Sequence, residues 1–259
     1  MRRHTAHCLI LLTLAAMLPP GLATAHFQTL IPSLPIVGPE SNRQIELDLR
    51  FTHPMQGGPA MQMGQPQRFG VLGPEGDRDL LPTLTPYRIE NARAFQARFR
   101  FTRPGDHIFY LQPARYWEPA EGVMIEHYTK VVVDAFAGEP AWDRLVGFPV
   151  EIEPLTRPYG LWRGNLFQGV VKRDGQPVPF AEVEVEWLND GSVTPPADAY
   201  VTQVVKADAN GTFSYALPRA GWWGFAALLE GPQPVTNPQG EEVPLEQGAL
   251  IWVHALEMP

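Results

Sequence analysis

The stretch RQIELDLRFTH (residues 43–53) decides the fold class, because its apolar residues occupy every second position. Side chains of a β-strand alternate between its two faces, so this pattern predicts a half-buried strand. The chain is broken often, by 28 prolines and 23 glycines, and helical periodicity is scarce. We therefore predict an all-β fold. The apolar row of this strand is Ile45, Leu47, Leu49 and Phe51.

Two further stretches repeat the alternation. AFQARFRFT (94–102) aligns Phe95, Ala97, Phe99 and Phe101, and EGVMIEHYTKVVVD (121–134) aligns Val123, Ile125, Val131 and Val133. Together with residues 43–53 they predict an antiparallel β-sandwich.

A change of pattern divides the chain into two domains. Residues 26–153 form the first predicted β-sandwich, and we assign the metal-binding role to it. Pro154 and Pro158 interrupt any strand that follows, so residues 154–165 are predicted to be a linker. Residues 166–259 contain short strands with turns every 8–12 residues, which predicts a second small sandwich.

The second domain is similar to accessory domains of the prealbumin or carboxypeptidase-regulatory type. The similarity lies in GVVKRDGQPVPFAEVEVEW (169–187) and ADANGTFSYALPRAGWW (207–223). It implies two tandem β-sandwiches, the second of them prealbumin-like.

Residues 1–25 have the features of a secretory signal peptide. A basic start precedes an apolar run from Cys8 to Leu18, and Ala23 and Ala25 form an A-x-A cleavage site. We therefore predict a periplasmic protein that begins at His26 and inserts no segment into the membrane. Because Cys8 is the sole cysteine, the mature chain has no thiol for disulfides, catalysis or metal binding.

Charge and motif content exclude several functions. Without Arg2 and Arg3, the 20 basic and 28 acidic residues become 18 and 28, a net charge of −10. This balance argues against nucleic acid as a partner. The sequence contains no G-x-S-x-G nucleophile motif, Walker motif or dinucleotide fingerprint. We therefore expect a protein that is not an enzyme.

The histidine that begins the predicted mature chain is the sharpest candidate for chemistry. The α-amine and the imidazole Nδ1 of His26 could chelate one metal ion together, as in a copper histidine brace. The alternative is that the peptidase simply leaves a histidine there.

His53 and His127 continue the apolar rows of their strands, so both imidazoles should point inward. A buried histidine needs a partner, which is a backbone carbonyl in the simplest interpretation. Together with His26, however, the two could form the imidazole-rich site that Ni, Co, Cu or Zn prefers.

Carboxylates and thioethers near these histidines extend the candidate site. Glu118 and Glu121 precede the His127 strand and could be oxygen ligands or could orient a histidine. Near His53, three methionines could bind Cu(I) or could simply fill gaps in the core. These are Met55, Met61 and Met63. We expect His107 and His254 to be structural.

Five long phrases are similar to the periplasmic component associated with bacterial nickel and cobalt uptake systems, a domain family of unassigned function with a nickel-uptake label. They are AHFQTLIPS (25–33), FTHPMQGGPAMQMGQPQRFGV (51–71), YWEPAEGVMIEHYTKVVVDAF (116–136), PLTRPYGLWRGNLFQGVV (154–171) and TQVVKADANGTFSYALPRAGWWGFAAL (202–228).

The resemblance implies a periplasmic protein that binds Ni²⁺ or Co²⁺ and hands it to a membrane transporter. The matching positions are His26, His53, His127 and Glu118, whereas the PGDH phrase departs from the family pattern at His107. Two alternatives stay open. One is a copper carrier or redox protein with a histidine brace, and the other is an envelope interaction protein that binds no metal.

Overall fold

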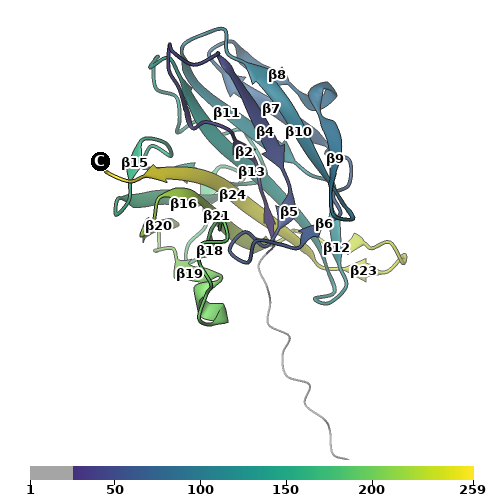
Figure 1. The fold of residues 1–259 in the computed structure, drawn as a ribbon. Helices are drawn as coiled ribbons and strands as arrows, with labels where there is room; N and C mark the ends of the chain where they lie inside the picture. The colour runs from purple at the N-terminus through teal and green to yellow at the C-terminus, as the bar shows by residue number, and fades with distance from the viewer. Residues whose placement is uncertain (1–25) are drawn as a thin grey trace, which may run out of the picture.

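The computed structural model describes residues 26–259, and the predicted signal peptide lies outside them. The described chain is all-β, as predicted, and its helical segments are two 3₁₀ turns. These are η1 (Leu81–Thr83) and η2 (Asp198–Tyr200). Figure 1 shows two β-sandwiches that follow one another along the chain.

The N-terminal sandwich packs one four-stranded sheet against part of a larger one. The four-stranded sheet is β2 (Ile31–Pro32), β4 (Gln44–Leu49), β10 (Ala92–Arg100) and β9 (Thr85–Ile89). The facing strands are β13 (Val123–Ala135), β11 (Gly105–Gln112), β7 (Arg68–Gly73) and β8 (Gly76–Asp79). The predicted apolar rows of residues 45–51 and 95–101 are buried in the core between them, so these predictions are confirmed.

The C-terminal sandwich has the same two-layer construction. One layer is β14 (Val150–Pro154), β16 (Leu166–Arg173), β17 (Gln176–Pro177) and β20 (Thr212–Ala216). The other is β19 (Gln203–Lys206), β18 (Glu182–Trp187), β21 (Gly221–Glu230) and β24 (Leu245–Leu256). Aromatic residues fill the core, where Phe167 lies 4.7 Å from Phe225 and 6.0 Å from Phe213 between ring centroids.

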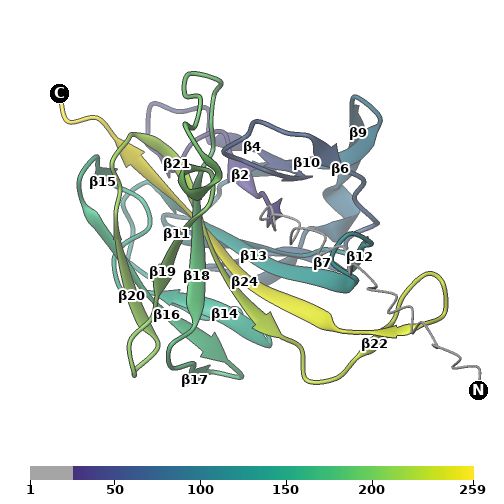
Figure 2. The same cartoon turned by 90° about the horizontal axis from the view of Figure 1, so that it is seen from below.

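One continuous sheet joins the two sandwiches, and the sequence pattern did not predict it. β13 and β24 pair in parallel from Met124↔Leu245 to Val131↔Trp252, so strands of both sandwiches form a shared sheet of eleven strands. Figure 2 shows the two strands side by side. Because side chains alternate, Trp252 enters the N-terminal core and Val253 the C-terminal core.

The remaining strands are short. β12 (Tyr116–Glu118) and β3 (Ile36–Val37) pair with β13, and β15 (Leu161–Trp162) pairs with β24. β22 (Val235–Thr236) and β23 (Glu242–Val243) form a hairpin. β1 (Phe27–Gln28), β5 (Phe51–Thr52) and β6 (Ala60–Met61) form a three-stranded sheet that carries part of the candidate site.

The segment around the predicted linker belongs structurally to the C-terminal half. β14 ends at Pro154, the first residue of the predicted linker, but it pairs with β16, and Val150 and Ile152 pack in the C-terminal core. Within residues 154–165, Leu161 is also buried there. The prolines thus mark the end of an outer strand of the second sandwich, whereas the exact domain boundary stays a prediction.

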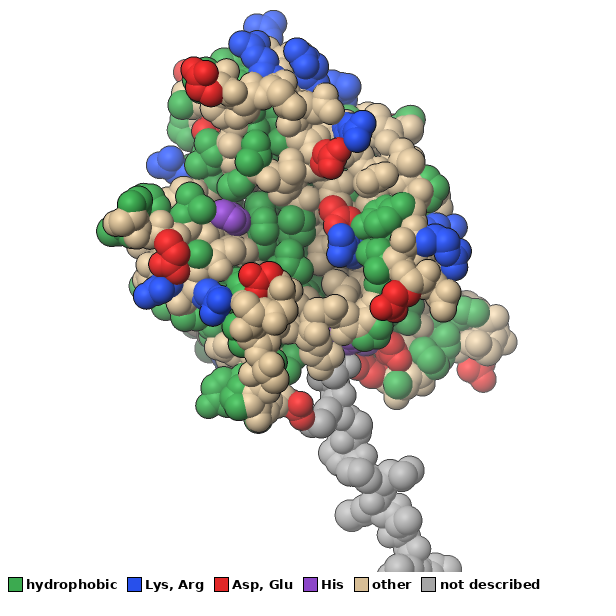
Figure 3. Space-filling view, in the orientation of Figure 1, with side chains coloured by type: hydrophobic (Ala, Val, Ile, Leu, Met, Phe, Trp, Pro, Cys, Tyr) green, Lys and Arg blue, Asp and Glu red, His purple; other side chains and the backbone are tan. Residues whose placement is uncertain are grey.

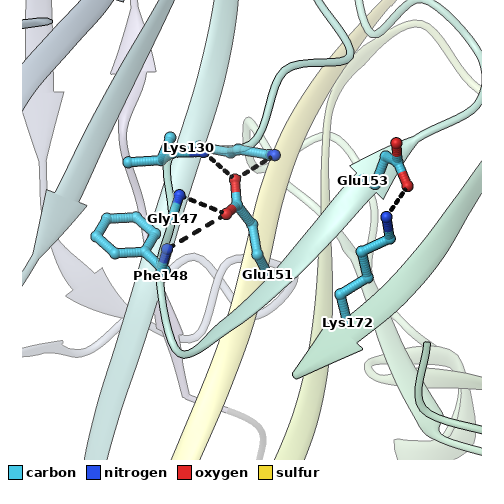
Figure 4. Close-up of polar contacts among 7 residues, drawn as sticks. Lys130, Gly147, Phe148, Glu151, Glu153 and Lys172 are labelled. Carbon is cyan, nitrogen blue, oxygen red and sulfur yellow. Dashed lines mark hydrogen bonds and ion pairs between the residues drawn. The ribbon is translucent and has the colours of Figure 1, made fainter. Parts of the chain in front are cut away.

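A buried ion pair links the two sandwiches at this point (Figure 4). The Lys130 ammonium on β13 lies 2.7 Å from a carboxylate oxygen of Glu151 on β14, and both side chains are buried. Glu151 also accepts backbone hydrogen bonds from Val146, Gly147 and Phe148. Its carboxylate therefore fixes both the turn before β14 and a strand of the other sandwich.

No helix within residues 26–259 is long and apolar enough to cross a bilayer. On the face drawn in Figure 3, acidic and basic side chains are mixed over the middle, and Lys and Arg side chains gather at the top. This face thus shows no broad acidic area that would attract cations.

Candidate metal site between the sandwiches

Strand pairing places His26 opposite His53. β1 and β5 are antiparallel, with Phe27 opposite Thr52 and Gln28 opposite Phe51, so the next position along each strand is a histidine. The two imidazole centroids are 4.6 Å apart. The side chain of His26 is 10% exposed, and His53 is buried. The structure thus brings these two predicted site residues together.

The C-terminal half anchors β1, the strand that directly follows His26. The Trp252 indole donates a hydrogen bond of 3.0 Å to the backbone carbonyl of Gln28. The Phe27 ring packs edge-on against Trp252, with centroids 6.1 Å apart. Because Trp252 lies on β24, the position of His26 depends on the shared sheet.

The loop that carries His53 is also held from the C-terminal half. The Met55 amide donates a 2.9 Å hydrogen bond to Glu186 Oε2, on β18. The Asn189 side-chain amide donates to the Met55 carbonyl at 2.9 Å. The backbone N–H of Asn189 donates to the Pro54 carbonyl at 3.1 Å. Residues on both sides of the domain junction therefore position His53.

The buried position of Glu186 predicts a stability that depends on pH. Burial raises the pKa of Glu186 to about 7, although hydrogen bonds from Thr202 and Met55 act to lower it. The folded state then holds its proton more tightly than the unfolded state, so stability falls as pH rises from about 4.5 to 7. A pKa raised by this amount corresponds to a loss of up to about 3 kcal/mol in the free energy of unfolding over this pH range.

We expect Glu186→Gln to remove this cost and increase stability at pH 8 by about 2–3 kcal/mol, because the amide can still accept from Met55 and can donate to the Thr202 hydroxyl. Urea unfolding at pH 5 and pH 8 measures the effect. Glu182→Gln, on the exposed part of the same strand, is the control and should change little. A Glu186→Gln variant that is less stable than the parent at pH 8 would contradict the assignment.

Glu118 orients the ring of His26. Its Oε2 lies 3.1 Å from His26 Nε2, and its Oε1 accepts a hydrogen bond from the Ala120 amide. Because an ionised carboxylate only accepts, this contact favours the tautomer with the proton on Nε2 and a lone pair on Nδ1. Burial and then the neighbouring His53 lower the pKa of His26 to about 4, so the ring is neutral at pH 7.

His127 lies nearby on β13 and is fully buried, as predicted. Its Nε2 is 3.2 Å from Glu246 Oε1 on β24, and its buried Nδ1 has no hydrogen-bond partner in the described part of the chain. The Phe51 ring packs against both His26 and His127, at centroid distances of 5.5 and 5.8 Å. A charge on His127 would lower the pKa of His26, so the two rings belong to one electrostatic environment.

Two carboxylates of this environment were not predicted from the sequence. Glu246 contacts His127, and Glu184 on β18 has a buried carboxylate oxygen without a hydrogen-bond partner among the described residues. Burial and the charges of Glu246, Glu186 and Glu121 raise the pKa of Glu184 to about 7. In VEVEW, Glu184 alternates with valines and is typical of a solvent-facing position, so only the shared sheet reveals its partial burial.

Glu121, the other predicted carboxylate, is exposed at the tip of the β12–β13 hairpin. Burial of part of its side chain and the charges of Glu246 and Glu118 raise its pKa. It therefore borders the site rather than contacting a histidine.

The other candidates lie elsewhere. His107 is buried against Phe101, with its Nδ1 2.9 Å from the Gly105 carbonyl, and His254 packs on Trp222. Both arrangements fit the structural role expected. The predicted methionine group is divided, because Met55 packs in the C-terminal core and Met63 in the N-terminal core, with Met61 against the latter.

Within residues 26–259, no three His, Cys, Asp or Glu side chains are already arranged to hold a metal ion. In the uncut chain the nitrogen of His26 belongs to the peptide bond with Ala25, so side chains alone supply the donors. The donors still fit an imidazole-binding metal: His26 and His53 adjoin, and Glu118 leaves Nδ1 of His26 open.

These features define an all-β protein of two sandwiches joined by a shared sheet, with histidines and carboxylates at the junction. The chain belongs to the family described as a domain of unknown function, DUF4198, whose family model matches residues 23–231. The match extends over both sandwiches. No curated protein matches the sequence.

Among solved structures, similarity is low. The adhesin InvE of Yersinia pseudotuberculosis has 13% identity over 86% of this chain, with a TM-score of 0.25, and the chain spans 58% of that structure. A two-domain fibronectin type-III segment of chicken tenascin has 11% identity, covers 86% of this chain and 98% of its own, and has a TM-score of 0.22. TM-scores this low establish no relationship.

Proposed function

We propose that this protein is a periplasmic carrier that binds Ni²⁺ or Co²⁺ through its processed N-terminus and delivers the ion to a membrane uptake transporter. The ligands are the α-amine and Nδ1 of His26 together with the imidazole of His53. Glu118 orients His26, and Glu121 borders the site as an outer acidic group. The observation that carries the proposal is the 3.1 Å contact between a Glu118 carboxylate oxygen and His26 Nε2, beside His53.

This contact matters because it involves Nε2 and not Nδ1. A chelate with the α-amine uses Nδ1, which is joined to that amine by the short path N–Cα–Cβ–Cγ–Nδ1. Glu118 contacts Nε2, at 3.1 Å, so Nδ1 is the ring nitrogen that the chelate would use. Carboxylates commonly hold metal-binding histidines in this way, and such outer partners contribute about 10–100-fold in metal affinity.

The protonation state of the site also suits a metal ion. The pKa of His26 is lowered to about 4, so its ring needs no deprotonation at neutral pH. Glu118, Glu121 and Glu246 lie around the cluster and balance the charge of a divalent cation. His127 is not required in this proposal, because the amine and Nδ1 of His26 and the imidazole of His53 already supply three nitrogen donors.

The choice of nickel or cobalt rests on the resemblance of the five sequence phrases to the uptake-associated family. Amine and imidazole ligands also suit copper, which binds such sites more tightly in general. Metal analysis of the protein purified from the periplasm therefore decides between a nickel or cobalt carrier and a copper protein.

Titration of Ni²⁺ by calorimetry into the mature protein, its first residue confirmed as His26 by mass, tests the site. We expect one additional alanine before His26 to weaken binding by about 100-fold or more, because the amine leaves the chelate. His53→Ala should weaken it similarly, and Glu118→Gln by about 10–100-fold. His254→Ala, which removes a histidine outside the site, is the control and should have no effect.

Binding that is indifferent to the added alanine would show that the processed terminus is not a ligand. Absence of binding by any of nickel, cobalt and copper would favour the envelope interaction protein instead.

A further inference from the structure

The imidazole of His127 has one occupied and one unoccupied nitrogen. Nε2 faces Glu246, whereas Nδ1 is buried without a hydrogen-bond partner in residues 26–259, on a residue that is 1% exposed. With Nε2 protonated toward the carboxylate, Nδ1 is a free lone pair. A buried acceptor without a hydrogen-bond partner destabilises the folded protein. A ligand that binds Nδ1 would remove this cost.

The neighbouring strands show where Nδ1 points. β13 lies between β24 on one side and β11 with β12 on the other. A Cβ atom on Gly248 of β24 would lie 2.3 Å from His127 Cδ2 and 2.8 Å from Nε2, so this edge of the ring faces β24. Nδ1 is the ring atom opposite the Cδ2–Nε2 bond, and therefore lies on the side of the ring away from β24.

Beside β12 lies a small cavity of about 10 Å³. His127, Phe51, Met63, Ala114 and Tyr116 contribute to its wall. This volume is at the lower limit for one water molecule, which also needs two to four polar partners. Gln28, Gln62 and Tyr116 also line the cavity, but the lone pair of Nδ1 together with a thioether suits a single soft ion.

Met63 supplies a second donor at this cavity. Its side chain is 4% exposed, and its sulfur lies 3.9 Å from Gln28 Nε2, which fixes the thioether in the core. A thioether and a neutral imidazole are the donor types that select Cu(I) over divalent ions. Met55 and Met61 do not line this cavity, so Met63 alone of the three methionines is placed there.

We infer that Nδ1 of His127 and the sulfur of Met63 bind one soft monovalent ion, Cu(I), in the cavity beside Phe51. This position is distinct from the nickel or cobalt ligands of the proposed function, which are the amine and Nδ1 of His26 and the imidazole of His53. The two proposed sites can therefore be tested independently of each other.

Silver(I), which has the same ligand preference and no redox chemistry, is the probe. The mature protein carries five methionines, and each methyl group gives its own signal after ¹³C-methyl labelling. We expect one equivalent of Ag⁺ in chloride-free buffer to shift the Met63 methyl signal selectively, with a dissociation constant below about 1 μM. Met63→Leu, which keeps a similar volume, should weaken binding by about 100-fold, whereas Met61→Leu should not.

The unmodified protein alone can overturn the inference. A shift of the Met55 or Met61 signal in place of Met63, or binding weaker than about 10 μM, contradicts it without any variant. Equal Ag⁺ affinity of Met63→Leu and the parent protein contradicts it as well. A His26→Ala variant should keep Ag⁺ binding and lose Ni²⁺ binding, which separates this site from the proposed function.

Discussion

Replacing Glu151 by alanine should destabilise the protein by about 3–5 kcal/mol, because it leaves a buried charge without its partner. Lys130 is 1% exposed, and its ammonium has the Glu151 carboxylate at 2.7 Å. The same carboxylate accepts the amides of Val146, Gly147 and Phe148, which would lose their acceptor (Figure 4). Leaving buried donors unpaired adds to the cost.

Urea unfolding at pH 7 measures the effect, and the same strand offers a matched control. Glu153 pairs with Lys172 at 2.5 Å, but both side chains are partly exposed, so Glu153→Ala should cost about 1 kcal/mol or less. Equal losses of stability in the two variants would show that burial of the Lys130–Glu151 pair does not determine its contribution to the free energy of unfolding. The pair connects β13 with β14, so its removal weakens the contact between the sandwiches.

The second large effect is expected for Gly248→Ala. A Cβ atom at this position would lie 2.3 Å from Cδ2 of His127, far inside van der Waals contact, and the His127 ring is enclosed. The ring must move away from β24 and lose its contact with Glu246. Overpacking of this kind costs about 1–3 kcal/mol, and loss of the histidine–carboxylate hydrogen bond adds about 1.5–3 kcal/mol.

The effect is measured by thermal unfolding together with the NMR signals of the His127 ring. Gly38→Ala is the control, because no atom lies within 4 Å of a Cβ at that position. A Gly248→Ala variant with parental stability and unchanged His127 signals would disprove the close packing of β13 on β24.

Local pattern was enough to predict the strands and the inward phase of two histidines. Alternation in residues 43–53 placed Ile45 and His53 on the buried side, and both are buried. Side-chain alternation is a property of the strand itself, so it can be recognised without knowledge of its neighbours. The structural roles expected for His107 and His254 follow from the same local reasoning.

The composition of the candidate site could be predicted only in part. The sequence indicated His26, His53, His127 and Glu118, but it did not indicate that Glu246 binds His127. Residues 127 and 246 are far apart in the chain, and parallel pairing of β13 with β24 brings them together. Glu184 was missed for the opposite reason, because its alternation with valines has the same appearance at a solvent face and at a buried junction.

The sequence by itself therefore determined the all-β class and the chemistry of the donors, since both depend on residue type and local spacing. Only the tertiary structure decided which donors meet. The pairing of β1 with β5 sets His26 opposite His53, and the hairpin of β12 and β13 brings Glu118 to His26. Such long-range pairings are selected by burial of whole sheet faces, to which no single stretch of sequence is a sufficient guide.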